Sequence, residues 1–112
     1  MDEVIINGIA YIKKDTAIDT DYVLVRCDRS GVFIGNIEKE EGNTATLKNA
    51  RRVWYWSGAA SLSQLAVEGT KKPNDCKFPM AVPEIRLKDV IEVIPCSEEA
   101  RKSLQGVKVW SA

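Results

Sequence analysis

Two turn signals divide the first half of the chain into short apolar runs. They are residues 28–31 (DRSG) and 40–43 (EEGN), whose Gly, Asn, Asp and Ser favour tight turns. Runs rich in β-branched and aromatic residues flank them at residues 22–27, 32–37 and 44–56. Such runs separated by turns predict consecutive antiparallel strands, so we expect a meander. The third run is long enough for one strand or a bulged pair.

Two short helices are predicted in the second half of the chain. The first is expected near residues 61–68, where Ser61 is followed by a Gln three positions later and by a Gly at the end. The second is expected near residues 97–105, capped by Ser97, with two glutamates in its first turn and basic residues later. This order of charges complements the helix dipole.

The remaining segments add further strands. Residues 1–14 contain apolar runs on both sides of an Asn-Gly pair, which predicts an N-terminal hairpin. Residues 84–87 alternate, residues 89–94 are rich in β-branched side chains, and Pro95 is expected to end that strand. We therefore predict a single α+β domain over residues 1–112, mainly an antiparallel β-sheet with two short α-helices.

The charge balance and the missing histidine narrow the functional classes. The chain of 112 residues has 16 Lys and Arg against 16 Asp and Glu, and no His. A neutral protein lacks the basic excess needed to coat nucleic acid. Without His, Ser-His hydrolysis and His-metal chemistry are excluded, and neither a phosphate-binding loop nor a nucleophile elbow is present. We therefore predict that the protein is not an enzyme and needs no cofactor or metal.

The cysteines and the N-terminal residues bear on the cellular compartment. Cys27, Cys76 and Cys96 are odd in number and far apart in sequence, which predicts reduced thiols rather than a disulfide framework. The apolar run at the N-terminus is too short and too interrupted for a secretion signal or a membrane-spanning helix. We expect a cytoplasmic protein that does not associate with membranes.

The densest group of chemically useful side chains lies at residues 49–56 (NARRVWYW). If the run from residue 44 is extended without a bulge, alternate residues share a face. One face then carries the residues expected in the core, Ala45, Leu47, Val53 and Tyr55. The other face carries Thr44, Thr46, Lys48, Arg52, Trp54 and Trp56. This second set is an aromatic and basic stripe that calls for an explanation.

Two interpretations of the stripe stay open. In the first, tryptophans stack on a base, arginines grip phosphate, and the start of the first helix faces an anion. The candidate ligand-binding residues are then Arg51, Arg52, Trp54, Trp56 and Ser61, with Arg26 as a more distant member. In the second, the tryptophans fill the core or a subunit interface, and arginines lie over them. Residues 1–50 have an acidic excess and residues 51–112 a basic one, which permits self-association, so we expect a homo-oligomer.

The sequence resembles small phage and prophage proteins over residues 22–105. The resemblance rests on the segments NARRVWYW, SLSQLA and IPC, together with Arg26, Gly31, Gly35, Gly58 and Gly69. Within this group the chain is similar to the anti-Thoeris sponge family. That resemblance implies a phage-encoded anti-defence protein in the bacterial host, which binds a cyclic ADP-ribose isomer or a cyclic oligonucleotide without cleaving it. It also implies an oligomer whose pockets are shared between subunits.

The chief alternative is a protein-binding inhibitor or a phage assembly factor. In that case Trp54, Trp56 and Trp110 form hot spots against a host or virion protein, since aromatic residues dominate such interfaces. Sequence-specific DNA binding is disfavoured, because the chain is neutral and lacks a basic recognition helix. A ligand-retention experiment separates the first two alternatives, because a sponge retains a small molecule that absorbs ultraviolet light.

Overall fold

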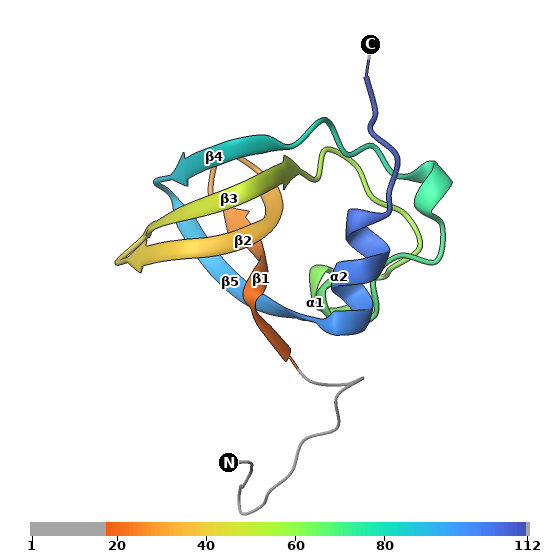
Figure 1. Cartoon of the computed structure of the whole chain (residues 1–112), viewed down its shortest axis with the longest axis horizontal. Coiled ribbons are helices and arrows are strands. Elements are labelled where there is room, and N and C mark those ends of the chain that lie inside the picture. Colours follow the sequence, from red (N-terminus) through yellow and green to blue (C-terminus); the bar gives the residue numbers. More distant parts are fainter. Residues whose placement is uncertain (1–17, 112) are drawn as a thin grey trace, which may run out of the picture.

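The computed structural model describes residues 18–111 and the side chains of residues 21–111. Within this part of the chain, one sheet contains β1 (Ile18–Cys27), β2 (Val32–Glu41), β3 (Thr44–Arg52), β4 (Val82–Leu87) and β5 (Val90–Ser97) (Figure 1). The helices are α1 (Leu62–Glu68), α2 (Glu98–Gln105) and the short 3-10 helix η2 (Pro73–Asp75). The chain is therefore a compact α+β domain with an antiparallel sheet, as predicted. The predicted hairpin at residues 1–14 lies outside the described residues.

The sheet curls because its two edge strands are neighbours in the sequence. The strand order is β4-β3-β2-β1-β5, so β4 and β5 lie at opposite edges. Only Lys88 and Asp89 join them, and Figure 1 shows the two strands meeting at this turn. The Asp89 carboxylate also holds the turn between β1 and β2: it accepts hydrogen bonds from the backbone N–H of Arg29 (2.6 Å) and of Ser30 (3.1 Å). These hydrogen bonds lower the pKa of Asp89, and the bond from Arg29 has the largest effect.

The curled sheet has two apolar cores, one on each face. The inner core draws on all five described strands: Val23, Val25, Cys27, Phe33, Leu47, Ala50 and Leu87, with Ile85 and Val90 packed against them. The helix-side core joins the other face to α1 and α2: Tyr22, Leu24, Ile34, Val53, Leu65, Ala66, Cys76, Phe78, Cys96, Ala100, Leu104 and Val107. Along β1 the side chains alternate between the two cores, as the two-residue period of a strand requires. Each face of the sheet therefore contributes side chains to a buried core.

The boundary of β5 differs from the prediction at Pro95. The proline does not end the strand, because Pro95 pairs with Val23 and β5 continues to Ser97. An edge strand tolerates proline, since one side of it needs no backbone donor. Ser97 then caps α2 directly, its hydroxyl accepting from the backbone N–H of Ala100 (3.0 Å). The predicted N-cap is confirmed.

A bulge interrupts β3 and changes which side chains share a face. Ile34 pairs with Arg51 and Asn36 with Lys48, which leaves Asn49 and Ala50 opposite Gly35. Asn49 has a φ of 51°, in the left-handed region that asparagine tolerates better than most residues. An extra residue reverses the inward and outward alternation beyond it.

The predicted face assignment of β3 is therefore wrong beyond residue 48. Leu47 contributes to the inner core, whereas Val53, expected on the same face, lies in the helix-side core. Arg52 was expected beside Thr46 and Lys48, but it points to the side of the inner core, over the Phe33 ring. The bulge is the physical reason, since it adds one residue to β3 with no counterpart in β2.

Candidate functional site

The adjacent arginines point to opposite sides of the sheet, and Arg51 is buried. Only 8% of Arg51 is exposed. Its guanidinium donates to the backbone carbonyls of Phe78 (2.8 Å), Pro79 (3.1 Å) and Val107 (2.8 Å). Longer bonds reach the carbonyls of Leu104 and Lys108. Burial lowers the pKa of Arg51, and the charge of Tyr22 acts in the opposite direction.

Arg51 connects separate parts of the chain through these hydrogen bonds. Its partners lie after η2 and at the C-terminal end of α2, so one side chain holds both segments to β3. The guanidinium also lies 5.4 Å from the centre of the Phe78 ring. The N–H groups of Arg51 are directed at carbonyls of its own chain.

Arg52 is exposed, at the rim of a small apolar hollow. Its Nη1 donates to the carbonyl of Ser30 (2.5 Å), and its guanidinium lies 4.5 Å from the centre of the Phe33 ring. The hollow has a volume of about 190 Å³ and is lined by Arg52 with Phe33, Ala50, Pro79, Met80, Val82 and Ile85. Arg52 therefore presents the remainder of its guanidinium to solvent next to apolar side chains.

An exposed group of aromatic rings lies beyond the end of β3. Trp54 is 63% exposed and stacks in parallel with Trp110: the ring centroids are 6.4 Å apart and the planes differ by 7°. The ammonium of Lys77 lies 5.7 Å from the Trp110 ring centre and 5.9 Å from that of Tyr55. We call these four residues, Trp54, Tyr55, Lys77 and Trp110, the aromatic platform. Three rings and one cation thus lie together at the surface.

Backbone hydrogen bonds position the aromatic platform. The N–H groups of Trp54 and Tyr55 donate to the carbonyl of Lys77 (3.1 and 3.3 Å), and the N–H of Lys77 donates to the carbonyl of Tyr55 (2.8 Å). On the other side, the N–H of Trp110 donates to the carbonyl of Phe78 (3.0 Å). Three chain segments that are far apart in sequence are therefore tied together beneath the rings.

Trp56 does not share a face with Trp54. Its side chain is half-buried against the helix-side core, and its Nε1 donates to the carbonyl of Ala59 (3.3 Å). Tyr55, expected in the core, is instead 51% exposed. Both predictions assumed a strand up to residue 56, but β3 ends at Arg52, and residues 53–56 contribute only an isolated bridge between Tyr55 and Lys77.

The other two candidate residues have their polar contacts elsewhere. The hydroxyl of Ser61 caps α1 by accepting from the N–H of Gln64 (3.1 Å), so the predicted N-cap is confirmed. The reciprocal bond of a capping box differs from the prediction, because the Gln64 side chain accepts from the N–H of Ala60 (2.8 Å), one residue before the cap. Arg26 lies on β1 and forms an ion pair with Glu92 (3.4 Å). Of the six candidates, the structure brings only Trp54 into the aromatic platform.

The sequence does not indicate Lys77 or Tyr55 as neighbours of Trp54, and it groups Trp110 with Trp54 only in the protein-binding alternative. The only local signal was the alternation at residues 107–110, which predicts an exposed extended segment at the end of the chain. The contact itself depends on a parallel bridge between Phe78 and Val109. Contacts of that range leave no trace in local periodicity.

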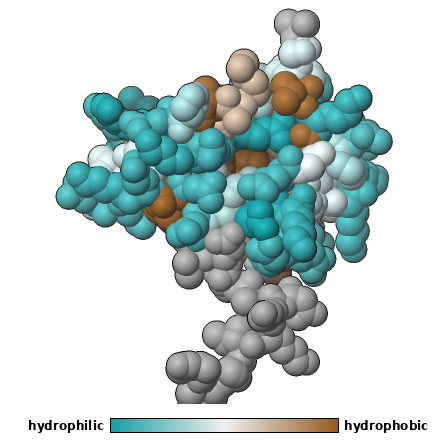
Figure 2. Space-filling model, viewed as in Figure 1, coloured by the Kyte–Doolittle hydropathy of each residue, from teal (hydrophilic) through white to brown (hydrophobic). Residues whose placement is uncertain are grey.

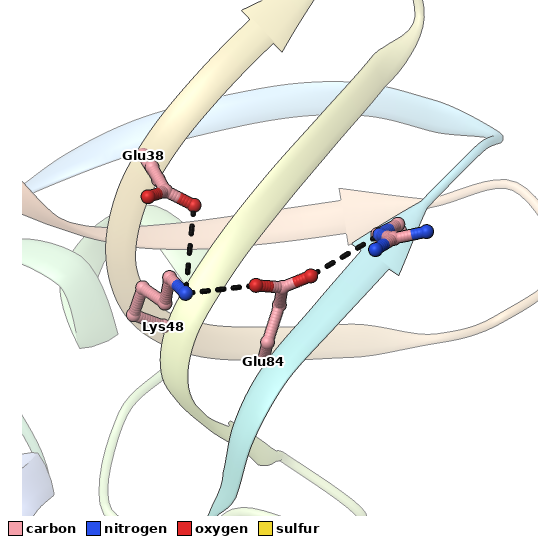
Figure 3. A network of polar contacts seen from close by, with 4 residues as sticks. Glu38, Lys48 and Glu84 are labelled. Carbon is pink, nitrogen blue, oxygen red and sulfur yellow. Dashed lines mark hydrogen bonds and ion pairs between the residues drawn. The ribbon is translucent and has the colours of Figure 1, made fainter.

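A network of charged side chains spans three strands of the sheet. Lys48 lies between Glu38 (3.7 Å) and Glu84 (2.8 Å), as Figure 3 shows, and Arg86 bonds the second carboxylate oxygen of Glu84 (3.1 Å). The hydrogen bond from Lys48 is the main cause that lowers the pKa of Glu84. The network fastens the edge strand β4 to its neighbours. In residues 18–111, no group of three or more Asp, Glu or Cys side chains has a geometry that could hold a metal ion.

Comparisons with known proteins identify a family. Residues 20–104 match the family described as a domain of unknown function (DUF6948), so the chain belongs to that family. Searches of curated proteins and of solved structures found no match. In the part of the chain that the structure describes, no helix has the length and apolar character to cross a membrane.

Proposed function

We propose that the protein binds a cyclic nucleotide and sequesters it without cleavage, as a phage-encoded anti-defence protein in the bacterial host. The ligand class is a cyclic ADP-ribose isomer or a cyclic oligonucleotide. One observation carries the proposal: the parallel, exposed pair Trp54 and Trp110 with the ammonium of Lys77 beside it. Single exposed aromatic residues are common, but exposed rings that lie together are typical of an interaction site.

The chemistry of the aromatic platform suits a nucleotide. Every base has a flat π face, and stacking on an aromatic side chain contributes about 1–3 kcal/mol per base. Lys77 offers a positive charge for phosphate within the same group of side chains. Relative to the sequence-based hypothesis, the phosphate contact moves from Arg51 to Lys77, because the Arg51 donors are used inside the fold.

Sequestration fits this site better than turnover does. The platform contains rings and an ammonium but neither an imidazole nor a carboxylate, the side chains that most often act as general acid or base. The chain has no histidine. A protein that removes a signal by binding it needs affinity and abundance only.

A second candidate function is protein binding, as an inhibitor or an assembly factor. The observation that favours it is a set of exposed apolar side chains in the same part of the sequence as the platform, Met80 (70%), Val82 (38%) and Val109 (58%). Figure 2 shows hydrophobic atoms gathered along the edge of the molecule where the chain enters β4 and where its C-terminal segment runs. Aromatic and apolar residues together are typical of the centre of a protein interface.

Equilibrium dialysis separates the candidates. The protein is dialysed against cyclic ADP-ribose isomers, linear ADP-ribose, and cyclic di- and trinucleotides, and bound ligand is released and identified by mass spectrometry. We expect at least one cyclic nucleotide to be retained and recovered with unchanged mass. Trp54→Ala should lose retention, whereas Ile91→Ala, which alters an apolar side chain of similar exposure on β5, should keep it.

Three outcomes contradict the proposal in different ways. Recovery of a ligand with altered mass means that the protein is an enzyme. Retention that survives Trp54→Ala places the binding site away from the platform. No retention of any nucleotide, combined with specific capture of a host or virion protein that Trp54→Ala abolishes, favours the protein-binding alternative.

A further inference from the structure

A second hollow adjoins the aromatic platform through Trp110. It has a volume of about 320 Å³ and is lined on one side by Pro73, Asn74 and Cys76, and on the other by Lys108, Val109 and Trp110. The Phe78–Val109 bridge and the hydrogen bond from Trp110 N–H to the Phe78 carbonyl hold the two walls together. The hollow is therefore a formed feature between two restrained segments.

The lining of the hollow offers a suitable group for the base, for the base edge and for the phosphate of one nucleotide unit. Trp110 supplies an aromatic ring, Asn74 an amide with donor and acceptor groups, and Lys108 a cation. Neither Asn74 nor Lys108 has a side-chain hydrogen bond or ion pair with any residue in 18–111, so both groups are available. No acidic side chain lines the hollow, and the ammonium of Lys77 lies 5.7 Å from the Trp110 ring centre. The electrostatic surroundings favour an anion.

We propose that this hollow holds one adenine nucleotide unit of the sequestered ligand, with the base stacked on Trp110, its edge read by Asn74 and its phosphate bound by Lys108. The inference rests on the proposed function and names the ligand more closely. An Asn amide matches the N6 donor and N7 acceptor of adenine, whereas guanine presents two acceptors at the corresponding positions. Pockets that hold small ligands begin at about 300 Å³, so the hollow accommodates one such unit and the rest of a cyclic ligand extends over the platform.

The test is an NMR titration of the full chain with 5′-AMP, 5′-GMP and adenosine, followed through the three indole N–H signals. Trp→Phe variants assign the signals. We expect AMP to shift the Trp110 signal first and to bind at least about fivefold more tightly than GMP, the lower end of what a bidentate base contact contributes. The Trp56 signal, whose N–H is bonded to Ala59, serves as the internal reference.

Matched variants test each contact. Asn74→Ala should remove the preference for AMP over GMP, while Asn43→Ala, which changes an exposed asparagine in the β2–β3 turn, should keep it. Lys108→Met should weaken AMP and leave adenosine unchanged, while Lys88→Met at the β4–β5 turn should affect neither. These four side chains are exposed, so we expect each variant to fold. Retention of the wild-type NMR spectrum checks this for each one.

The outcomes separate this inference from the proposed function. Equal binding of AMP and GMP, or a preference that survives Asn74→Ala, overturns the adenine site. If in that case cyclic dinucleotides of guanine still bind and still require Trp54, the proposed function stands without it. If neither the mononucleotides nor the cyclic nucleotides shift any indole signal at millimolar concentration, the adenine site and the proposed function are both overturned.

Discussion

The Nη1 of Arg51 donates to the carbonyl of Val107 across 2.8 Å, and this bond ties β3 to the residues that follow α2. The same guanidinium bonds the carbonyls of Phe78 and Pro79. These two segments lead directly to Lys77 on one side and to Trp110 on the other. A buried arginine, which the sequence suggested as a phosphate ligand, therefore supports the site from beneath.

Replacing Arg51 should destabilise the fold. In Arg51→Met at least three well-bonded carbonyls lose their donor, so we expect the free energy of unfolding to fall by about 2–4 kcal/mol. Arg51→Lys should not restore it, because an ammonium cannot reproduce the fork of donors. Urea denaturation measures the change. Arg52→Met is the control and should cost less than about 1 kcal/mol; equal costs for the two arginines would contradict the assigned roles.

The glycine at position 58 should tolerate no side chain. Gly58 has a φ of 86°, and an added Cβ would lie 2.5 Å from the backbone nitrogen of Lys72 and 2.7 Å from that of Lys71. We expect Gly58→Ala to cost more than about 2 kcal/mol, because the clash is with backbone atoms. Gly42→Ala is the matched control: its φ is 56° with nothing within 4 Å of the added Cβ, so only backbone strain of about 1–2 kcal/mol remains. Thermal unfolding of the two variants compares them directly, and an equal loss would show that the close approach at Gly58 is absent.

Stability should decline at alkaline pH because of Cys27. Burial, with a smaller contribution from the charge of Asp89, raises the pKa of the Cys27 thiol from 9.0 to about 11. The unfolded chain thus releases this proton at lower pH than the native protein does. The stabilisation is present below about pH 9 and is lost as the pH rises towards 11, by roughly 2–3 kcal/mol in total. Denaturation of the wild type and Cys27→Ala between pH 8 and 11 should show a steeper decline for the wild type; parallel curves would refute this origin.

The two tryptophans of the 49–56 segment should differ in their contribution to stability. Trp54 is mostly exposed, so Trp54→Ala should cost less than about 1 kcal/mol. Trp56 packs against the helix-side core, so Trp56→Ala should cost about 2–4 kcal/mol. Acrylamide quenching of the single-tryptophan variants offers an independent check, since Trp54 should be the more accessible. Similar losses of stability and similar quenching would contradict this difference and would favour a shared face for Trp54 and Trp56, as the sequence pattern predicts.

Much of the fold follows from local chemistry. The turns at residues 28–31 and 40–43, the Ser61 and Ser97 caps and the apolar runs between them predict the strands and helices close to where they occur. These signals act over a few residues, so they can be read without knowing the tertiary structure. The edge position of β5, which allows Pro95 inside a strand, depends on the strand order and is not visible locally.

The candidate site was less predictable because one bulge controls it. Asn49 adopts a left-handed backbone opposite Gly35, where a Cβ would lie 3.0 Å from the Ala50 Cα. That close approach is a tertiary relationship, and the bulge exchanges the faces of the residues beyond it, so that Arg52 lies over Phe33 and Arg51 is buried on the side of the helices. The pairing of Trp54 with Trp110 depends on a second long-range contact, the bridge between Phe78 and Val109. The sequence alone indicates the segment and two of the four platform residues: Trp54 as a ligand contact, and Trp110 only in the protein-binding alternative.

The role of the aromatic platform in nucleotide binding can be measured by isothermal titration calorimetry of the wild type, Lys77→Glu and Lys88→Glu against cyclic ADP-ribose isomers and cyclic dinucleotides. We expect the wild type to bind at least one of these ligands. Lys77→Glu should weaken that ligand by at least about tenfold, because a charge-assisted bond to phosphate is replaced by repulsion. Lys88→Glu, which makes the same charge change at the distant β4–β5 turn, should bind within about twofold of the wild type. No heat of binding to the wild type, or equal affinities for all three proteins, would contradict nucleotide binding at the aromatic platform.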